Sequence, residues 1–106
     1  MPEKNLTAAE QEISIGFDRL YNGGFAIQVS GNSTGLELEV EGTVHTKAPI
    51  EWFPLSVESY NDRSYITQIV DNGGFWGNAI ALAQIRARVG AITNGTARVS
   101  LEAKQG

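Results

Sequence analysis

Apolar and polar residues alternate along much of this chain, most regularly between residues 84 and 103. The alternation covers 85–91, stops at the turn signal Asn94-Gly95, and resumes over 97–103. A period of two with one apolar face is typical of a half-buried strand, and Asn-Gly between two such runs indicates a hairpin. A helix over 79–88 is the alternative, because that segment is rich in Ala, Leu, Gln and Arg. We predict the hairpin.

The register of this predicted hairpin follows from keeping its apolar residues on one face. A two-residue loop would mix core and solvent side chains, which is the one-residue slip that flips a strand. A three-residue loop instead pairs Val89 with Val99 and keeps both faces in phase. It also sets Arg86 opposite Glu102, an attractive cross-strand pair. We therefore expect a type I turn with Gly95 in the left-handed region, forming a glycine bulge.

The same reasoning predicts a second hairpin in the first half of the chain. Apolar residues alternate with small or polar ones over 25–29, a polar loop follows, and the alternation resumes over 36–44. Pairing Val29 with Leu36 keeps the two apolar faces in phase. The last inward side chain of the second strand would be Val44.

Charged residues mark the outer faces of these strands. One strand carries three glutamates on one face, Glu37, Glu39 and Glu41, which alone would repel one another. The C-terminal hairpin carries a basic counterpart, Arg86, Arg88 and Arg98. Opposite charges on neighbouring strands stabilise a sheet by about 0.2–1 kcal/mol per pair. We therefore expect the strand at 36–44 to lie beside one strand of the C-terminal hairpin. The alternative is that the two stripes face solvent or separate partners.

Further apolar runs at 13–20, 51–57, 65–70 and 75–76 complete the set of strands. Pro54 cannot donate a ladder hydrogen bond, so its strand is expected at a sheet edge or at a bulge. About eight strands separated by turn signals predict an all-β fold, an antiparallel β-sandwich of jelly-roll-like character. The 106 residues fit a single domain, placed at 13–106, after an N-terminal arm at 1–12. A short helical turn capped by Thr7 is the alternative for part of that arm.

Composition narrows the functional classes. The chain has no cysteine and a formal net charge of -4, so we expect no disulfide, no thiolate metal site and no binding to nucleic acid. No apolar run approaches the roughly 20 residues of a membrane span. His45 is the only histidine, and we interpret the three glutamates as a solvated face rather than a glycosidase pair. We therefore expect no membrane partner, no metal, no cofactor and no enzymatic activity.

Two pairs of adjacent aromatic residues are candidates for an interface, namely Trp52 with Phe53 and Phe75 with Trp76. Neighbours on a strand point to opposite faces, so one member of each pair is expected outside the core unless it packs at a bend. An exposed tryptophan can bind a protein partner or stack on a sugar ring. In the predicted arm, Leu6 and Thr7 are candidate contacts with a neighbouring subunit.

The order of these features resembles a group of small β-sandwich proteins from tailed-bacteriophage genomes. The resemblance covers about 36–103. It consists of the strand LELEVEGTV, Trp52 with Pro54-Leu55, an Ile-x-x-Ile strand, Asn72-Gly73 before an aromatic residue, and IRARV ahead of TNGTARV. Two departures stand out. Thr46-Lys47-Ala48-Pro49 replaces the group's Asp-Gly turn before the tryptophan, and Asn94-Gly95 replaces its Ser-Gly. The pattern marks a fold, so no functional residue is carried over.

The resemblance implies a structural component of the virion, such as a capsid decoration or cement protein. We therefore expect a non-enzymatic virion protein, assembled in the host cytoplasm, that stabilises the head by bridging capsid subunits. Its partners would be the major capsid protein or another virion protein, and further copies of itself. The alternative is a carbohydrate-binding protein or a tail or head–tail component that uses its exposed aromatic residues.

Overall fold

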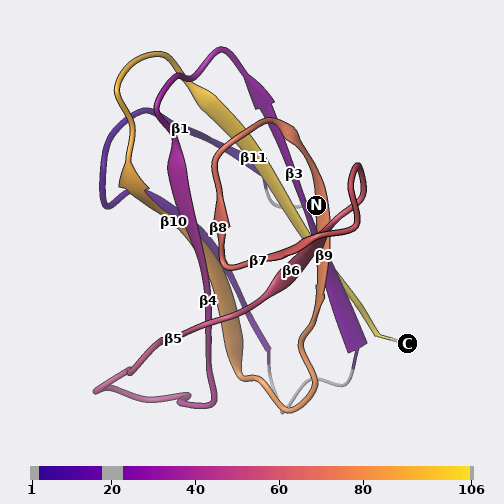
Figure 1. Cartoon of the computed structure of the whole chain (residues 1–106). Coiled ribbons are helices and arrows are strands. Elements are labelled where there is room, and N and C mark those ends of the chain that lie inside the picture. Colours follow the sequence, from indigo (N-terminus) through magenta and orange to yellow (C-terminus); the bar gives the residue numbers. More distant parts are fainter. Residues whose placement is uncertain (1–2, 18–22, 106) are drawn as a thin grey trace.

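The computed structural model describes residues 3–17 and 23–105, which form a sandwich of two antiparallel sheets (Figure 1). In chain order the strands are β1 (Glu3–Leu6), β2 (Glu12–Gly16), β3 (Gly23–Gly31), β4 (Glu37–Thr43), β5 (Phe53–Pro54), β6 (Val57–Ser59), β7 (Tyr65–Ile66), β8 (Gln68–Ile69), β9 (Gly73–Asn78), β10 (Gln84–Ala91) and β11 (Ala97–Gln105). One sheet has six strands in the order β1-β11-β3-β9-β6-β7. The other contains β2-β10-β4-β5 in that order, with β8 also pairing to β4. The predicted all-β antiparallel sandwich is confirmed, and the described residues contain no helix.

The described residues form more strands than the eight expected, because two of the predicted runs divide and the segment predicted as an arm contributes β1. The run at 65–70 becomes β7 in the six-stranded sheet and β8 beside β4 in the other sheet. The run at 51–57 becomes β5 and the start of β6. Pro54 lies in β5 at a sheet edge, as its missing N–H predicts. The last three residues of the run predicted at 13–20 lie outside the described residues.

The two predicted hairpins are wrong. β10 pairs with β2 and β4, whereas β11 pairs with β1 and β3 in the opposite sheet. β3 and β4 are divided between the sheets in the same way (Figure 1). Val99 therefore lies opposite Val29, and Val89 opposite Leu38. Glu102 lies opposite Ala26 rather than Arg86. Alternation fixes which side chains point inward, but two inward faces can meet across a sandwich as well as within one sheet.

Each predicted hairpin is instead an arch that crosses between the sheets, and the two arches hold each other. Thr34 and Asn94 form an isolated bridge. The Asn32 N–H donates to the Thr96 carbonyl oxygen over 3.1 Å, and the Thr96 N–H donates to Asn32 Oδ1 over 2.9 Å. Gly95 has a φ of +80°, so its predicted left-handed conformation is confirmed. A Cβ on Gly95 would lie 2.4 Å from the Asn32 carbonyl oxygen, so the arch needs glycine at this position.

The predicted relation between the charge stripes is confirmed for one strand of each predicted hairpin. β4 lies beside β10, with Glu41 opposite Arg86 and Glu39 opposite Arg88. Arg98 belongs to the other sheet. Val44 lies beyond the end of β4 and is 54% exposed, so its predicted inward position is wrong.

The segment predicted as an arm belongs, in its described part, to the sandwich. β1 forms one edge of the six-stranded sheet beside β11, and Leu6 is buried in the core. A turn follows in which Gln11 Oε1 accepts hydrogen bonds from the N–H of Thr7 (2.7 Å) and of Ala8 (3.2 Å). The chain then enters the other sheet as β2. The helical turn considered for this segment is not formed, because the described residues contain no helix.

The core lies between the inner faces of the two sheets. Its fully buried large apolar side chains are Leu6, Ile27, Leu38, Ile69, Ile85, Leu101, Val29, Val40, Val57, Val89 and Val99. Burying a side chain of this kind stabilises a fold by about 1.5–3 kcal/mol. The alternate positions point outward, so polar and aromatic groups gather on the outer faces of the two sheets.

Candidate functional site

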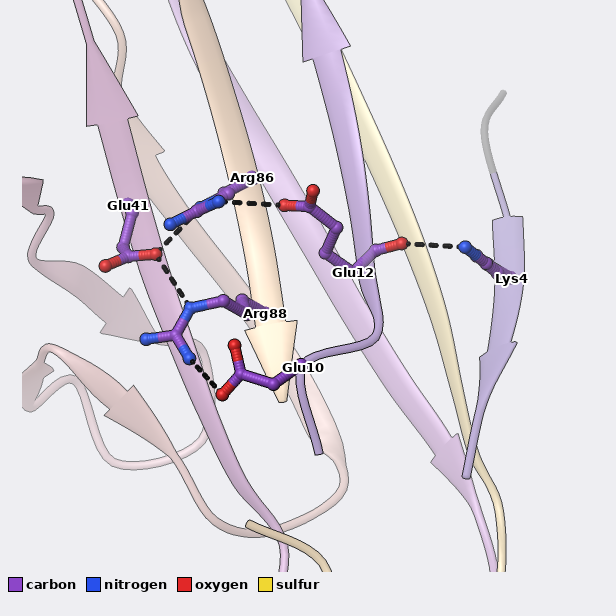
Figure 2. A network of polar contacts seen from close by, with 6 residues as sticks. All are labelled: Lys4, Glu10, Glu12, Glu41, Arg86 and Arg88. Atoms are coloured by element: carbon purple, nitrogen blue, oxygen red, sulfur yellow. Dashed lines mark hydrogen bonds and ion pairs between the residues drawn. The ribbon is translucent and has the colours of Figure 1, made fainter. Parts of the chain in front are cut away.

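The outer face of the five-stranded sheet is a ladder of paired charges (Figure 2). Because β10 lies between β2 and β4, its arginines reach glutamates on both sides. Arg86 donates from Nε to Glu41 over 2.8 Å and from Nη1 to Glu12 over 3.2 Å. Arg88 donates from Nε to the same Glu41 oxygen and from Nη1 to Glu10, each over 3.3 Å. The hydrogen bond to Glu41 is the main cause that raises the pKa of Arg88.

Further contacts complete this charged face. Gln68 Nε2 donates to Glu39 over 2.8 Å and to Glu37 over 3.4 Å. The guanidinium carbon of Arg86 lies 4.1 Å from the centre of the Trp52 ring, a cation–π contact. Trp52 is only partly exposed, and its ring is already in contact with Arg86 of the same chain. On this face Glu10, Glu12 and Glu41 therefore pair with arginines, whereas Glu37 and Glu39 accept hydrogen bonds from Gln68.

The outer face of the six-stranded sheet has a different character. Strand register places Glu102, Ala26, Trp76 and Glu58 in one row across β11, β3, β9 and β6. In the neighbouring row Gln28 lies opposite Gly74. The Tyr60 ring covers Gly74, and a Cβ added to Gly74 would lie 3.2 Å from Tyr60 Cδ2. Small residues between large aromatic ones leave a depression in the sheet surface.

We call this depression the aromatic hollow and define it by Tyr60, Trp76 and Glu102. It consists of two adjoining open parts with volumes of about 400 and 190 Å³. Tyr60, Glu102 and Ala26 border both parts, and most of the lining is apolar. The larger part falls within the range of roughly 300–1,000 Å³ that is usual for ligand sites. The hollow can therefore accept a side chain or a small ring.

The two carboxylates beside the hollow differ in their partners. Glu58 is buried and forms an ion pair with Arg63, and the hydrogen bond between them raises the pKa of Arg63. Glu102 is exposed, and no cation lies within ion-pair distance of it among the side chains that the structure describes. Glu102 therefore leaves a negative charge beside an apolar, aromatic surface.

The structure places the candidate interface residues in several different environments. Trp76 is 37% exposed at the aromatic hollow, while Phe75 is buried in the core. Phe53 is 41% exposed on the edge strand β5. Phe75 and Trp76 therefore divide between core and surface as expected, whereas neither Trp52 nor Phe53 belongs to the core. Leu6 is fully buried, and Thr7 is exposed in the turn after β1.

Sequence reasoning missed two of the three residues that define the hollow. Tyr60 was part of a polar turn with no pattern of its own, yet it is 61% exposed above Gly74. Glu102 was predicted to pair with Arg86, because the hairpin register expected from the sequence was wrong. A usable signal existed in the small residues Ala26 and Gly74, because a sheet surface with small side chains beside aromatic ones leaves open space.

The single histidine and the loop carboxylate of Asp62 have local hydrogen-bond partners. No group of three or more His, Cys, Asp or Glu residues there could hold a metal ion. The His45 Nδ1 accepts a hydrogen bond from the Glu51 N–H over 3.2 Å. Asp62 accepts two hydrogen bonds from Ser64 within a turn, and the one from the Ser64 hydroxyl is the main cause that lowers its pKa. In residues 3–17 and 23–105, no helix is long and apolar enough to cross a membrane.

Comparison with known proteins yields one informative similarity. No protein-family model matches the chain, and no curated protein matches its sequence. Among solved structures, the chain is similar to the SPBc2 prophage-derived protein YomS, with a TM-score of 0.71 at 15% sequence identity. The similarity covers 97% of this chain and 94% of that one. The chain therefore shares the whole fold of a protein that comes from a prophage.

Proposed function

We propose that this chain is a non-enzymatic structural protein of a phage particle, and specifically a capsid decoration or cement protein. The observation that carries the proposal is the similarity to YomS, because it spans nearly the full length of both chains. The order of strands and turns over 36–103, which resembles small virion sandwiches, supports the same class. The proposed partners are the major capsid protein or another virion protein, in a particle assembled in the host cytoplasm.

The difference between the two outer faces supports a docking orientation. The five-stranded face binds its own charges in the ladder around Arg86 and Arg88. The six-stranded face presents the exposed aromatic residues Tyr60 and Trp76. It also presents Glu102, which has no cation partner among the side chains that the structure describes. Exposed aromatic residues are enriched at the centres of protein interfaces. We therefore assign the six-stranded face to the contact with the particle.

The edge strand β1 provides a second surface for assembly. Its inner side pairs with β11, and its outer side lies at the end of the six-stranded sheet. An open edge can pair with a strand of another molecule. Repetition of such contacts by the symmetry of the shell would connect copies across subunit boundaries and resist expansion. This surface supports the proposal that the chain is oligomeric on the particle.

The pairing of the ionisable groups supports a role without catalysis. The arginines of the ladder bind glutamates at 2.8–3.3 Å instead of converging with them on a cavity. The net charge of -4 disfavours a nucleic-acid partner.

Co-sedimentation with capsids tests the proposal. The purified protein is mixed with mature capsids of the encoding phage from which it has been stripped or deleted. We expect saturable binding at a fixed ratio to the major capsid subunit, and shells that survive heating better than bare ones. Absence of binding at saturating protein would refute the decoration role. Binding to isolated tails alone would instead support the tail or head–tail alternative.

A further inference from the structure

We propose that the aromatic hollow binds the side chain of an arginine or lysine on the partner protein. This inference rests on the proposed function, because it names the chemistry by which the six-stranded face recognises a virion protein. The bound cation would contact the faces of Trp76 and Tyr60 and form an ion pair with Glu102.

The aromatic residues supply the first part of the argument. Trp76 and Tyr60 are both exposed and both border the larger part of the hollow. Tryptophan and tyrosine attract a cation that lies over the ring face. In the described part of the chain, the one cation–π contact is that of Arg86 with Trp52, on the opposite face of the sandwich. The Trp76 ring is therefore available to a cation from outside.

The carboxylate supplies the second part. Glu102 borders both parts of the hollow, beside a lining that is mostly apolar. It lies two strands from Trp76 in the same row, with Ala26 between them. At the usual strand spacing, this separates the two backbone positions by roughly 10 Å. A guanidinium can stack on an aromatic face while its N–H groups donate to a carboxylate, and both groups here border the same hollow.

The chain already contains this arrangement on its other face. Arg86 lies over Trp52 at 4.1 Å and binds Glu41 at 2.8 Å, so one arginine joins an aromatic ring to a glutamate. On the six-stranded face Trp76 and Glu102 recur in one row, and the strand between them carries Ala26. The described arginines of that face pair with other carboxylates, Arg63 with Glu58 and Arg98 with Glu3. The short side chain of Ala26 leaves room for a long cationic side chain to enter from a partner.

Charge favours a basic side chain over a sugar ring. A neutral saccharide could stack on Trp76 and bond to polar groups such as Gln28 and Ser100, but it would leave the charge of Glu102 uncompensated. A cation is attracted by the rings, by Glu102 and by the net charge of -4. The saccharide is therefore the competing outcome of the test.

A small-molecule titration tests the site without any phage particle. Trp52→Phe keeps an aromatic ring beside Arg86 and makes Trp76 the only tryptophan fluorophore. The probes are Nα-acetyl-arginine amide, its uncharged citrulline counterpart, and glucose, galactose and N-acetylglucosamine. We expect a saturable change in Trp76 fluorescence with the arginine probe. The citrulline probe should bind about two- to fivefold more weakly, and 0.5 M NaCl should reduce the difference.

Two glutamine variants locate the effect. Glu102→Gln should weaken the arginine probe about two- to fivefold, because it removes the ion pair and leaves the aromatic faces in place. Glu37→Gln makes the same chemical change on the opposite face and should leave the titration unchanged. Equal binding of arginine and citrulline, saturation by a saccharide alone, or no saturable response at Trp76 would each overturn the proposal.

Capsid binding then separates this inference from the proposed function. If the wild-type protein does not sediment with capsids, the decoration role fails, and the titration alone decides the chemistry of the hollow. If the wild-type protein binds and Glu102→Gln binds several-fold more weakly than Glu37→Gln, both proposals are supported. If all three proteins bind equally, the hollow is not the recognition site and the decoration role stands. Equal thermal midpoints of the variants would exclude misfolding as the cause.

Discussion

The contact between the two arches predicts that any substitution of Gly95 lowers the stability of the fold. Its φ of +80° would cost an alanine about 1–2 kcal/mol, whereas asparagine tolerates that region well. Any Cβ at this position would also lie 2.4 Å from the Asn32 carbonyl oxygen. The arches must then separate and lose the two hydrogen bonds between Asn32 and Thr96. At about 0.5–1.5 kcal/mol each, this loss amounts to about 1–3 kcal/mol.

Gly95→Asn therefore isolates the contact between the arches from the strain in φ. We expect it to lower the free energy of unfolding by about 1–3 kcal/mol, and Gly95→Ala to lower it by about 2–5 kcal/mol. In a simple hairpin turn, Gly95→Asn would cost little, because no Asn32 carbonyl would oppose its Cβ.

Urea unfolding, followed by tryptophan fluorescence, measures these differences within a total of about 5–15 kcal/mol for a domain of this kind. Gly16→Ala is the matched control, since a Cβ there would meet Gln84 Cγ at an ordinary 3.8 Å and φ lies outside the left-handed region. Its stability should stay within about 0.5 kcal/mol of the wild type or rise slightly. A Gly95→Asn protein as stable as the wild type would refute the role assigned to the paired arches.

Three further predictions follow from the two outer faces. Arg86→Met removes the hydrogen bonds to Glu41 and Glu12 and should lower the free energy of unfolding by about 1–2 kcal/mol in urea titrations. The loss should shrink in a Glu41→Gln background, where position 41 has no carboxylate for Arg86 to pair with. The pKa of Glu3 is lowered chiefly by its hydrogen bond from Arg98. The ionised Glu3 therefore stabilises the fold at pH values above its ordinary pKa of 4.5, and this contribution is lost as the pH falls through the lowered pKa. Glu3→Gln should therefore lose less stability than the wild type when thermal midpoints are compared across that acid range. Ala26→Arg should place a cation of the chain itself in the aromatic hollow, abolish the response to the arginine probe, and raise stability by about 0.2–1 kcal/mol.

The sequence predicted the inward side chains well but assigned their partners wrongly. Val89 and Val99 point into the core as their alternation indicates, yet they lie in different sheets instead of opposite each other. Period two determines a face, whereas the choice between a hairpin and an arch depends on contacts between distant loops. Charge gave the long-range information that alternation lacks. The glutamate stripe at 37–41 predicted a neighbour among the last two strands, and that neighbour is β10, with Glu41 opposite Arg86.

The candidate site was less predictable than the fold. Trp76 could be selected because it follows Phe75 on one strand, and adjacent residues point to opposite faces. Glu102 and Tyr60 could not, because their proximity depends on the register of β11, β3 and β9 and on a turn that folds back over Gly74. These relations join segments that are far apart in the chain, and no local pattern encodes them.

The division of β10 and β11 between the two sheets has a consequence for how the chain folds. β10 lies between β2 and β4, and β11 lies between β1 and β3, so each sheet has an internal strand from the last quarter of the chain. During synthesis, β4 therefore lacks its neighbour β10, and β3 lacks its neighbour β11, until the ribosome has translated those strands. Long-range pairing of this kind is slow, on the order of milliseconds to seconds, and it exposes strand edges to other chains. High-level expression should accordingly favour aggregation of unfinished chains, and lower temperature or slower translation should raise the soluble yield.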